Sequence, residues 1–415
     1  MKPLVLLLAS ATIARAFSPG TESDFAHELY PDPAVVYVPK NYTPDRKFPV
    51  VFNYPGTNGS PNTRIPKAYT LGRDFVIVGL QYATKGKSKL TRDYLEIEIA
   101  ALRAIRTELA GKLSIDPARS YVGGFSKGGW FASEFAEATM KDFAGAYILG
   151  AGKNHRRVRR AVQFGPTRKP VYVGIGHQDP NYIYAARAVP HFRKLGATVT
   201  FDDYLNRGHD LPMGSAERDL SPAFRHWWQI EAARVARPEI PITTQATDWA
   251  SRMVAFSTTL ESPLHRYLHL RRTLRDPFVA ILPKDASNAL RSALKEVGTD
   301  PALSKELSLE KKYRQLVDKE SSTESWDHYL SSARAYHGLY RTAPDTHAGK
   351  MAGLEYARLA TLLGMSNRWT FATTSERDRA IADLKANPLP EIPLEDLRRY
   401  AQDLSDTLTP YPSFK

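Results

Sequence analysis

The chain has 415 residues, and a length of this order predicts two domains. Its content of 42% hydrophobic and 24% charged residues is ordinary for a globular protein, while the complete absence of cysteine excludes disulfides, thiolate zinc sites and a cysteine nucleophile. The net charge of +13 belongs mainly to the first part: residues 1–240 hold 33 Lys and Arg against 22 Asp and Glu, whereas residues 241–415 hold 24 against 22.

The N-terminus has the pattern of a signal peptide. Lys2 is followed by the apolar run 4–13 and then by Ala14-Arg15-Ala16, a small-x-small cleavage pattern. The run is too short to anchor the chain across a bilayer, and no later stretch is apolar enough to do so. We therefore expect cleavage after Ala16 and export of the protein; the alternative is a buried N-terminal strand or helix.

From residue 35 to residue 236, short apolar runs alternate with helical periodicity. The runs are of strand length and apolar on both faces, as buried parallel strands are. This alternation predicts an α/β fold, a mostly parallel sheet with flanking helices, whose sites lie at the carboxyl ends of its strands. We expect strands at 35–38, 48–54, 75–80, 120–122, 146–149, 171–175 and 198–204, and helices at 92–110, 128–140, 182–195 and 222–236.

The pattern changes near residue 240. Pro238, Pro241 and Thr243-Thr244 suggest a linker, after which helix-length segments dominate and strand-like runs are nearly absent. We predict a catalytic domain at residues 17–240 and an all-helical domain of unknown role at 241–415. The expected helices are 246–260, 264–275, 286–297, 303–318, 324–340, 346–364, 375–386 and 394–407.

One motif carries specific chemistry. Residues 124–128 match G-x-S-x-G, directly after an expected strand and directly before an expected helix. In such an elbow the turn is so tight that only glycines fit at the flanking positions, and the serine hydroxyl is raised above the sheet. The following helix N-terminus directs N–H groups at developing negative charge. Ser126 is therefore the candidate nucleophile; the alternative is a structural glycine turn.

A serine nucleophile needs a base, and the base needs an acid to orient it. His209 follows the last expected strand, and Asp179 follows the strand 171–175, which makes the chain order nucleophile, acid, histidine. His177 is the nearest rival to His209, and Asp179 has the alternative of capping the turn before Pro180. We predict Ser126, His209 and Asp179 as a catalytic triad.

An acyl-transfer site also needs two N–H donors for the oxyanion. We expect one from the backbone of Lys127, which follows the nucleophile, and one from the loop after strand 48–54. That loop reads Pro55-Gly56-Thr57-Asn58-Gly59, and its glycines allow the backbone to approach a substrate closely. The backbone N–H of Thr57 is the expected second donor.

These motifs make residues 30–236 resemble the secreted α/β-hydrolase esterases related to polyhydroxybutyrate depolymerases and to feruloyl or acetyl-xylan esterases. The resemblance implies ester hydrolysis through an acyl-enzyme, whereas the spacing alone implies only acyl transfer. Two features depart from that group: Pro55-Gly56 stands where His-Gly is common, and cysteines are absent. The resemblance is carried by Tyr37-Val38-Pro39, Asn41-Tyr42, the loop 55–59, the stretch 115–128, the turn 176–179 and Gly208-His209.

Substrate contacts are less well defined by sequence. The basic stretch 153–169, which includes Arg156 and Arg157, follows an expected strand and so should lie on the catalytic side, where it would favour anionic esters; the alternative is a solvated basic loop. Trp130 either lines the pocket or, as we favour, packs its helix on the sheet. Nucleic-acid binding is a poor fit, because the basic residues lack interleaved aromatic residues.

Three function classes remain. The first is an exported serine carboxylic ester hydrolase acting on small-molecule, polysaccharide- or polymer-linked esters. The second is a serine peptidase of the same fold, and the third is a non-catalytic binding protein on a hydrolase scaffold. We expect neither a metal nor a cofactor, because the sequence has no dense cluster of His, Asp and Glu with ligand spacing.

Overall fold

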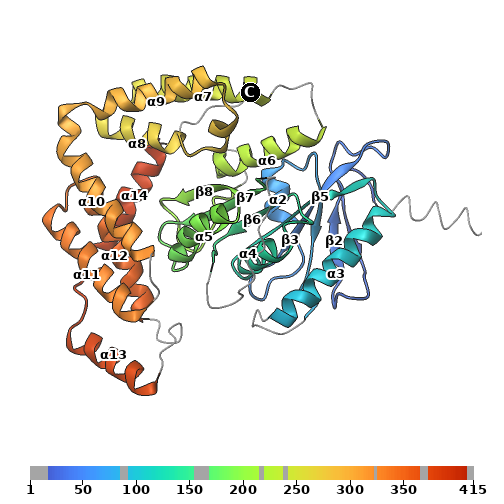
Figure 1. The fold of residues 1–415 in the computed structure, drawn as a ribbon, viewed down its shortest axis with the longest axis horizontal. Helices are drawn as coiled ribbons and strands as arrows, with labels where there is room; N and C mark the ends of the chain where they lie inside the picture. Colours follow the sequence, from blue (N-terminus) through green and yellow to red (C-terminus); the bar gives the residue numbers. More distant parts are fainter. Residues whose placement is uncertain are drawn as a thin grey trace, which may run out of the picture.

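The computed structural model describes residues 17–84, 92–153, 168–214, 219–236, 242–321, 325–364 and 373–408. Its centre is an eight-stranded sheet with the order β1-β2-β4-β3-β5-β6-β7-β8, in which β3 to β8 run parallel and β1 and β2 pair antiparallel (Figure 1). The strands are β1 (Glu22–Phe25), β2 (Ala34–Tyr37), β3 (Phe48–Tyr54), β4 (Val76–Gly79), β5 (Ile115–Phe125), β6 (Gly145–Leu149), β7 (Pro170–Gly176) and β8 (Thr198–Tyr204).

Helices cover both faces of this sheet, and the alternation of side chains along each strand builds a core on each side. In β3, Val50 and Phe52 face one core, while Val51 faces the other. The first core is closed by α3 (Arg92–Ala110), α4 (Lys127–Thr139) and α5 (Tyr182–Lys194), and the second by α2 (Arg64–Tyr69) and α6 (Pro222–Ala236). Burial on both faces explains why the strands are continuously apolar.

The core under α6 is unusually rich in aromatic side chains. Tyr121, Tyr147 and Tyr172 project from successive strands toward Phe224 and Trp228, and the Tyr172 and Phe224 rings stack with centroids 4.1 Å apart. The tyrosine hydroxyl groups keep partners inside this core. That of Tyr147 donates to Asn53 Oδ1 at 2.7 Å, and that of Tyr121 donates to Glu231 at 2.7 Å. The strands thus gain aromatic packing without leaving buried polar atoms unpaired at these positions.

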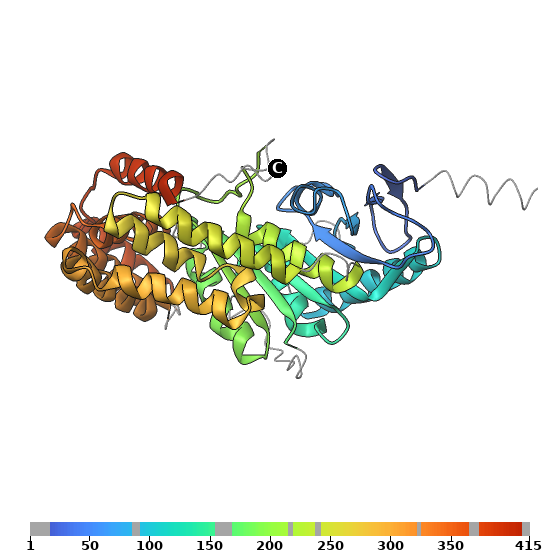
Figure 2. The ribbon, with the colours of Figure 1, turned by 90° about the horizontal axis from the view of Figure 1, so that it is seen from above.

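The rest of the described chain is helical and wraps around the β8 end of the sheet (Figures 1 and 2). Helices α7 to α9 lie over α6, where the His226 ring stacks on Phe278 and its Nδ1 lies 2.9 Å from Asp276. A separate hydrophobic core is shared by α10, α11, α12, α14 and Ile183 of α5. The bounds are α7 (Ile242–Thr259), α8 (Pro263–Thr273), α9 (Lys284–Gly298), α10 (Ser304–Ser321), α11 (Trp326–Thr342), α12 (His347–Gly364), α13 (Thr374–Ala386) and α14 (Leu394–Leu408), with 3₁₀ turns at Pro277–Ile281 and Pro301–Leu303.

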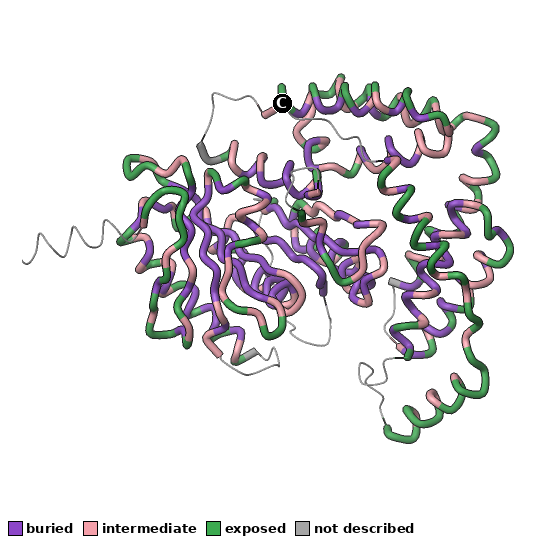
Figure 3. The backbone as a smooth tube through the Cα atoms, turned by 180° about the vertical axis from the view of Figure 1, so that it is seen from behind, coloured by how far each residue is buried: buried purple, intermediate pink, exposed green. Residues whose placement is uncertain are grey.

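Burial differs among these helices (Figure 3). Helix α12 is buried along most of its length, because α10, α11 and α14 all pack against it, whereas no residue of α13 is buried. Within the described residues no helix combines the length and the apolar character that a membrane crossing requires.

The predicted fold class is confirmed: a mostly parallel sheet with flanking helices is followed by a helical region. Two short elements, β1 and α2, were not expected, since four and six residues are too few for a clear period. Thr243 and Thr244 lie inside α7, so they are not part of a linker. Pro238, Pro241 and the expected signal peptide lie outside the described residues, and the domain boundary at residue 240 stays a prediction.

Removing Trp228 should strongly destabilise the protein. Its side chain is 1% exposed and contacts the rings of Phe75, Tyr121 and Tyr147, so Trp228→Ala should lower the free energy of unfolding by about 3–5 kcal/mol in urea denaturation. The matched control is Ile97→Ala on α3, a 50% exposed apolar residue that should change stability by less than about 0.5 kcal/mol. Equal effects of the two substitutions would contradict the packing described here.

Candidate active site

Ser126 occupies the sharp turn between β5 and α4. Its backbone has φ 57° and ψ −117°, a conformation that is strained for a residue with a side chain. A Cβ atom on Gly124 or on Gly128 would overlap the carbonyl oxygen of Tyr54 at the end of β3. The two flanking glycines are therefore required by the neighbouring strand, which is the physical reason for the spacing in the motif.

Ser126, His209 and Asp179 form one hydrogen-bonded chain. His209 Nε2 lies 2.8 Å from Ser126 Oγ, and His209 Nδ1 lies 2.7 Å from Asp179 Oδ2. The Asp179 side chain is fully buried, and its Oδ1 accepts a hydrogen bond from the Asn181 backbone N–H at 2.8 Å. A carboxylate that accepts from Nδ1–H leaves Nε2 as the acceptor that faces the serine hydroxyl. This geometry can perform proton transfer from the hydroxyl to the imidazole.

The acid and the histidine meet because their strands are neighbours. Asp179 follows β7 and His209 follows β8, and parallel strands end at the same edge of a sheet. The Gln178 N–H donates to the Arg207 carbonyl at 3.0 Å, and a Cβ on Gly176 would overlap the carbonyl oxygen of Gly208. The turn before the acid is thus in direct backbone contact with the turn before the histidine.

The loop after β3 lies beside the elbow. A Cβ built on Gly56 would sit 3.7 Å from Ser126 Cβ, and the Tyr82 hydroxyl donates to the Pro55 carbonyl at 2.8 Å. Tyr82 thus fixes this loop through the carbonyl of Pro55. Lys127 is the first residue of α4, and its Nζ lies 4.3 Å from the centroid of the Tyr82 ring. The oxyanion roles of the Lys127 and Thr57 N–H groups stay predictions.

The expected substrate residues fare differently. Trp130 is partly buried and packs edge-on against Tyr184 of α5 with centroids 5.1 Å apart, and its role toward a substrate stays a prediction. Lys153 is 1% exposed and is ion-paired with Glu134 and Glu137. Arg156 and Arg157 lie outside the described residues.

The expectation that the whole basic stretch lies on the catalytic side was wrong at its C-terminal end. Lys169 directly precedes β7, at the opposite edge of the sheet from the site, where its Nζ donates to the Phe143 carbonyl at 2.6 Å. The Lys153 charge is paired with two buried glutamates and is not exposed on the surface. The error came from assigning one location to a run that ends at the amino end of the next parallel strand.

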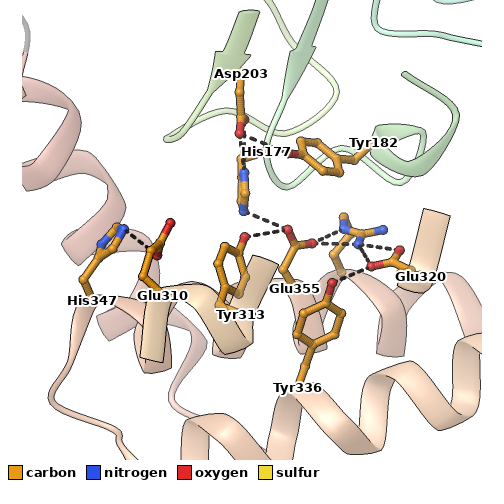
Figure 4. Close-up of polar contacts among 10 residues, drawn as sticks. His177, Tyr182, Asp203, Glu310, Tyr313, Glu320, Tyr336, His347 and Glu355 are labelled. Carbon is orange, nitrogen blue, oxygen red and sulfur yellow. Dashed lines mark hydrogen bonds and ion pairs between the residues drawn. The ribbon is translucent and has the colours of Figure 1, made fainter. Parts of the chain in front are cut away.

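His177, the rival histidine, has a different environment. Its imidazole is 2% exposed and lies between two carboxylates: Nδ1 is 2.9 Å from Asp203 of β8, and Nε2 is 3.2 Å from Glu355 of α12 (Figure 4). Burial disfavours the charged ring, but the two carboxylates outweigh burial and raise the pKa of His177 to about 10. Sequence reasoning missed this arrangement, because Glu355 is distant in the chain and no motif marks it.

A polar cleft of about 510 Å³ adjoins the histidine turn. One wall is formed by the turns that precede the acid and the histidine, and the other by one face of α14. No sequence signal indicated it, since its walls come from segments about 190 or more residues apart in the chain. The lining residues are Gln178, Asn206, Gly208, Glu395, Arg398, Arg399 and Gln402.

Among the described residues, no group of three or more His, Asp and Glu side chains is arranged to hold a metal ion.

Comparisons with known proteins leave the family open. No protein-family model matches the chain, and no curated protein matches it. Solved structures to which it is similar include a thermostable esterase (20% identity, TM-score 0.36, 53% of this chain and 61% of that chain) and a carboxylesterase from Mesorhizobium loti (15%, 0.40, 50% and 98%). A CE1 ferulic acid esterase from Anaeromyces mucronatus is a third (13%, 0.35, 46% and 84%). At these low scores the likeness assigns no activity to this chain.

Substituting the elbow glycine should disable the site. In Gly128→Ala, the new methyl group would overlap the Tyr54 carbonyl, so β3 and the turn must move apart and Ser126 must leave its position beside His209. We expect at least a 100-fold loss of covalent labelling of Ser126 by a fluorophosphonate, because misplacement by about 1 Å costs on the order of 10²-fold. Gly338→Ala is the control, since a Cβ there meets nothing within 4 Å. Labelling of Gly128→Ala at the wild-type rate would contradict the tight-turn argument.

Proposed function

We propose that the protein is a serine carboxylic ester hydrolase that acts through an acyl-enzyme. The observation that carries the proposal is the continuous chain from Ser126 Oγ to His209 Nε2 at 2.8 Å and from His209 Nδ1 to buried Asp179 at 2.7 Å. It is set on a strained strand-to-helix elbow, where a serine hydroxyl is exposed to substrate. A serine hydroxyl gains nucleophilicity only with such an oriented base.

The reaction follows from these positions. Ser126 Oγ attacks the ester carbonyl while His209 takes the hydroxyl proton, and Asp179 stabilises the imidazolium that forms. The backbone N–H groups of Lys127 and Thr57 donate hydrogen bonds to the carbonyl oxygen and stabilise the negative charge that develops on it. His209 then gives its proton to the departing alcohol. A water molecule, deprotonated by the same imidazole, hydrolyses the acyl-Ser126 ester and restores the enzyme.

The cleft supports a proposal about the substrate. It opens beside Gly208 and is lined by amide, arginine and glutamate side chains rather than by apolar ones. A large polar alcohol portion, such as a polysaccharide chain, can form hydrogen bonds to amide and guanidinium groups in such a cleft. We therefore favour polysaccharide- or polymer-linked esters over esters of apolar alcohols.

Two other functions keep the same scaffold. A serine peptidase would use the same three side chains on an amide, and a binding protein would use the helical region with an inactive site. No observation on the described residues favours either of them. Hydrolysis of a short-chain p-nitrophenyl ester, compared with hydrolysis of a peptide amide, separates the three: the proposal expects turnover of the ester alone, and a preference for the amide would replace it with the peptidase.

Labelling tests the nucleophile directly. A fluorophosphonate probe should form an adduct that peptide mass spectrometry maps to Ser126, and Ser126→Ala should remain folded, stay unlabelled and lose about 10⁵–10⁶-fold in kcat on the p-nitrophenyl ester. Ser133→Ala on α4 is the control, because this buried serine lies in the helix that follows Ser126 but outside the triad. An adduct on another residue, or turnover retained by Ser126→Ala, would overturn the proposal.

We also propose that the protein is exported, on the evidence of its N-terminal sequence. The expected outcome is a mature protein that begins at Phe17, since the small residues Ala14 and Ala16 suit a signal peptidase. N-terminal sequencing or intact-mass measurement of the protein made in a secreting host checks this. Recovery of the protein in the cytosol with residues 1–16 intact would contradict it.

A further inference from the structure

The helical region makes direct contact with both turns that carry the acid and the histidine. Glu355 of α12 pairs with His177 at 3.2 Å, and Arg398 of α14 donates to Gln178 Oε1 at 3.3 Å. His177 and Gln178 are the two residues immediately before Asp179. On the other turn, Asn206 donates to Gln402 of α14 at 2.7 Å, three residues before His209.

We propose that α12 and α14 hold the acid and the histidine in register with Ser126, and that Glu355 is a positioning residue for the reaction. This inference rests on the proposed ester hydrolase function and adds a role for the helical region. Glu355 does not touch the reacting atoms; it acts through His177 on the turn that ends at Asp179.

Glu355 is the centre of a buried ionic network (Figure 4). Its carboxylate is fully buried. Besides His177, it is ion-paired with Arg358 at 2.6 Å and accepts a hydrogen bond from the Tyr313 hydroxyl at 3.0 Å. Arg358 is shared with Glu320, which also accepts from the Tyr336 hydroxyl at 2.9 Å. Both charged partners hold the pKa of Glu355 below its ordinary value despite its burial. A buried carboxylate whose partners come from α10, from its own helix α12 and from the turn after β7 is a rigid support, because every neighbour loses a partner if it moves.

His177 transmits this rigidity to the acid. Asp203 holds the His177 ring from the other side and also accepts a hydrogen bond from the Tyr182 hydroxyl at 3.1 Å. The backbone N–H of His177 donates to the Tyr204 carbonyl at 3.0 Å. Only Gln178 separates it from Asp179. A displacement of His177 must therefore be absorbed within two residues of the acid, and an error of about 1 Å at a reacting group costs on the order of 10²-fold in rate.

The network also requires a charged His177. The groups around it are Asp203 from β8, Tyr182 from α5, Tyr313 from α10, and His347 and Glu355 from α12, with Arg358 and Glu320 bonded behind Glu355. Within the described part of the chain, the carboxylates of Asp203, Glu320 and Glu355 pair with two cations, Arg358 and His177. The pKa of His177 is raised above its ordinary 6.5 to about 10, so its contribution to stability is complete below pH 6.5 and is lost as the pH rises through about 10.

The decisive experiment compares two buried glutamates of the helical region in the full-length protein. Glu355→Gln keeps the shape but removes the charge beside His177, and it should lower kcat on a p-nitrophenyl ester about 10-fold while KM changes less than about twofold. Glu310→Gln is the matched control: Glu310 is buried and ion-paired with Arg271, and it makes no contact with either turn. It should lower the melting temperature and leave kcat within twofold. Equal effects on kcat would reduce Glu355 to a structural role and overturn the inference.

The pH profile gives a second readout that loss of stability alone does not produce. Without the Glu355 charge, the pKa of His177 falls, so the alkaline limb of kcat in Glu355→Gln should move to lower pH than in the wild type. In Glu310→Gln the limb should stay where it is in the wild type. An alkaline limb unmoved in Glu355→Gln would also overturn the inference.

Two further measurements test the inference if Glu355→Gln does not fold or if the protein does not turn over the ester. Gln402→Ala removes an exposed side chain that the fold tolerates, and its lost contact with Asn206 should lower kcat about threefold at unchanged melting temperature. If Glu355→Gln does not fold, an unchanged kcat in Gln402→Ala overturns the inference.

The downfield proton NMR signal of the His209–Asp179 hydrogen bond needs no substrate. An identical signal in wild type and Glu355→Gln overturns the inference even where the ester assay, and with it the proposed function, has failed.

Discussion

The parallel pairing of β7 with β8 is the constraint on which the candidate site depends. It brings two strand ends to the same edge of the sheet, and the backbone contact of Gly176 with Gly208 presses the two following turns together. Asp179 and His209 are 30 residues apart in the chain, yet they meet at 2.7 Å because of that contact. Any side chain at Gly176 would separate the turns and break the proton-transfer chain.

The remainder of the fold holds this edge in place from both sides. Below it, the rings of Tyr147, Tyr172 and Phe224 fill the space between the strands and α6, so the strands cannot slide without opening a cavity. Beside it, the core that α12 shares with Ile183 of α5 and the ionic network around Glu355 join the helical region to the eight-stranded sheet. The helical region is thus packed against the part that carries the site rather than tethered to it.

Prediction from sequence succeeded where the signal is local. The G-x-S-x-G spacing identifies the elbow because a tight turn excludes side chains at fixed positions, and strand and helix periods identify most of the elements. Local signals failed for β1 and α2, which are too short for a period, and for the basic stretch, whose described ends lie in a buried ion pair and at the opposite edge of the sheet. The choice of Asp179 depended on its position after a strand, whereas Asp202 lies within β8 and accepts a hydrogen bond from the Tyr172 hydroxyl at 2.6 Å.

By itself, the sequence determined the class of fold, the order of its elements and three side chains suited to one kind of chemistry, since each of these follows from the local pattern of apolar residues, glycines and turns. Only the tertiary structure decided which histidine faces Ser126, what surrounds His177 and where the polar cleft lies. The physical reason is that these depend on contacts between distant segments: Glu355 lies 178 residues after His177, and Gln402 of α14 lies 196 residues after Asn206, with which it is hydrogen-bonded. Such contacts are fixed by burial and charge balance, which no short stretch of sequence displays.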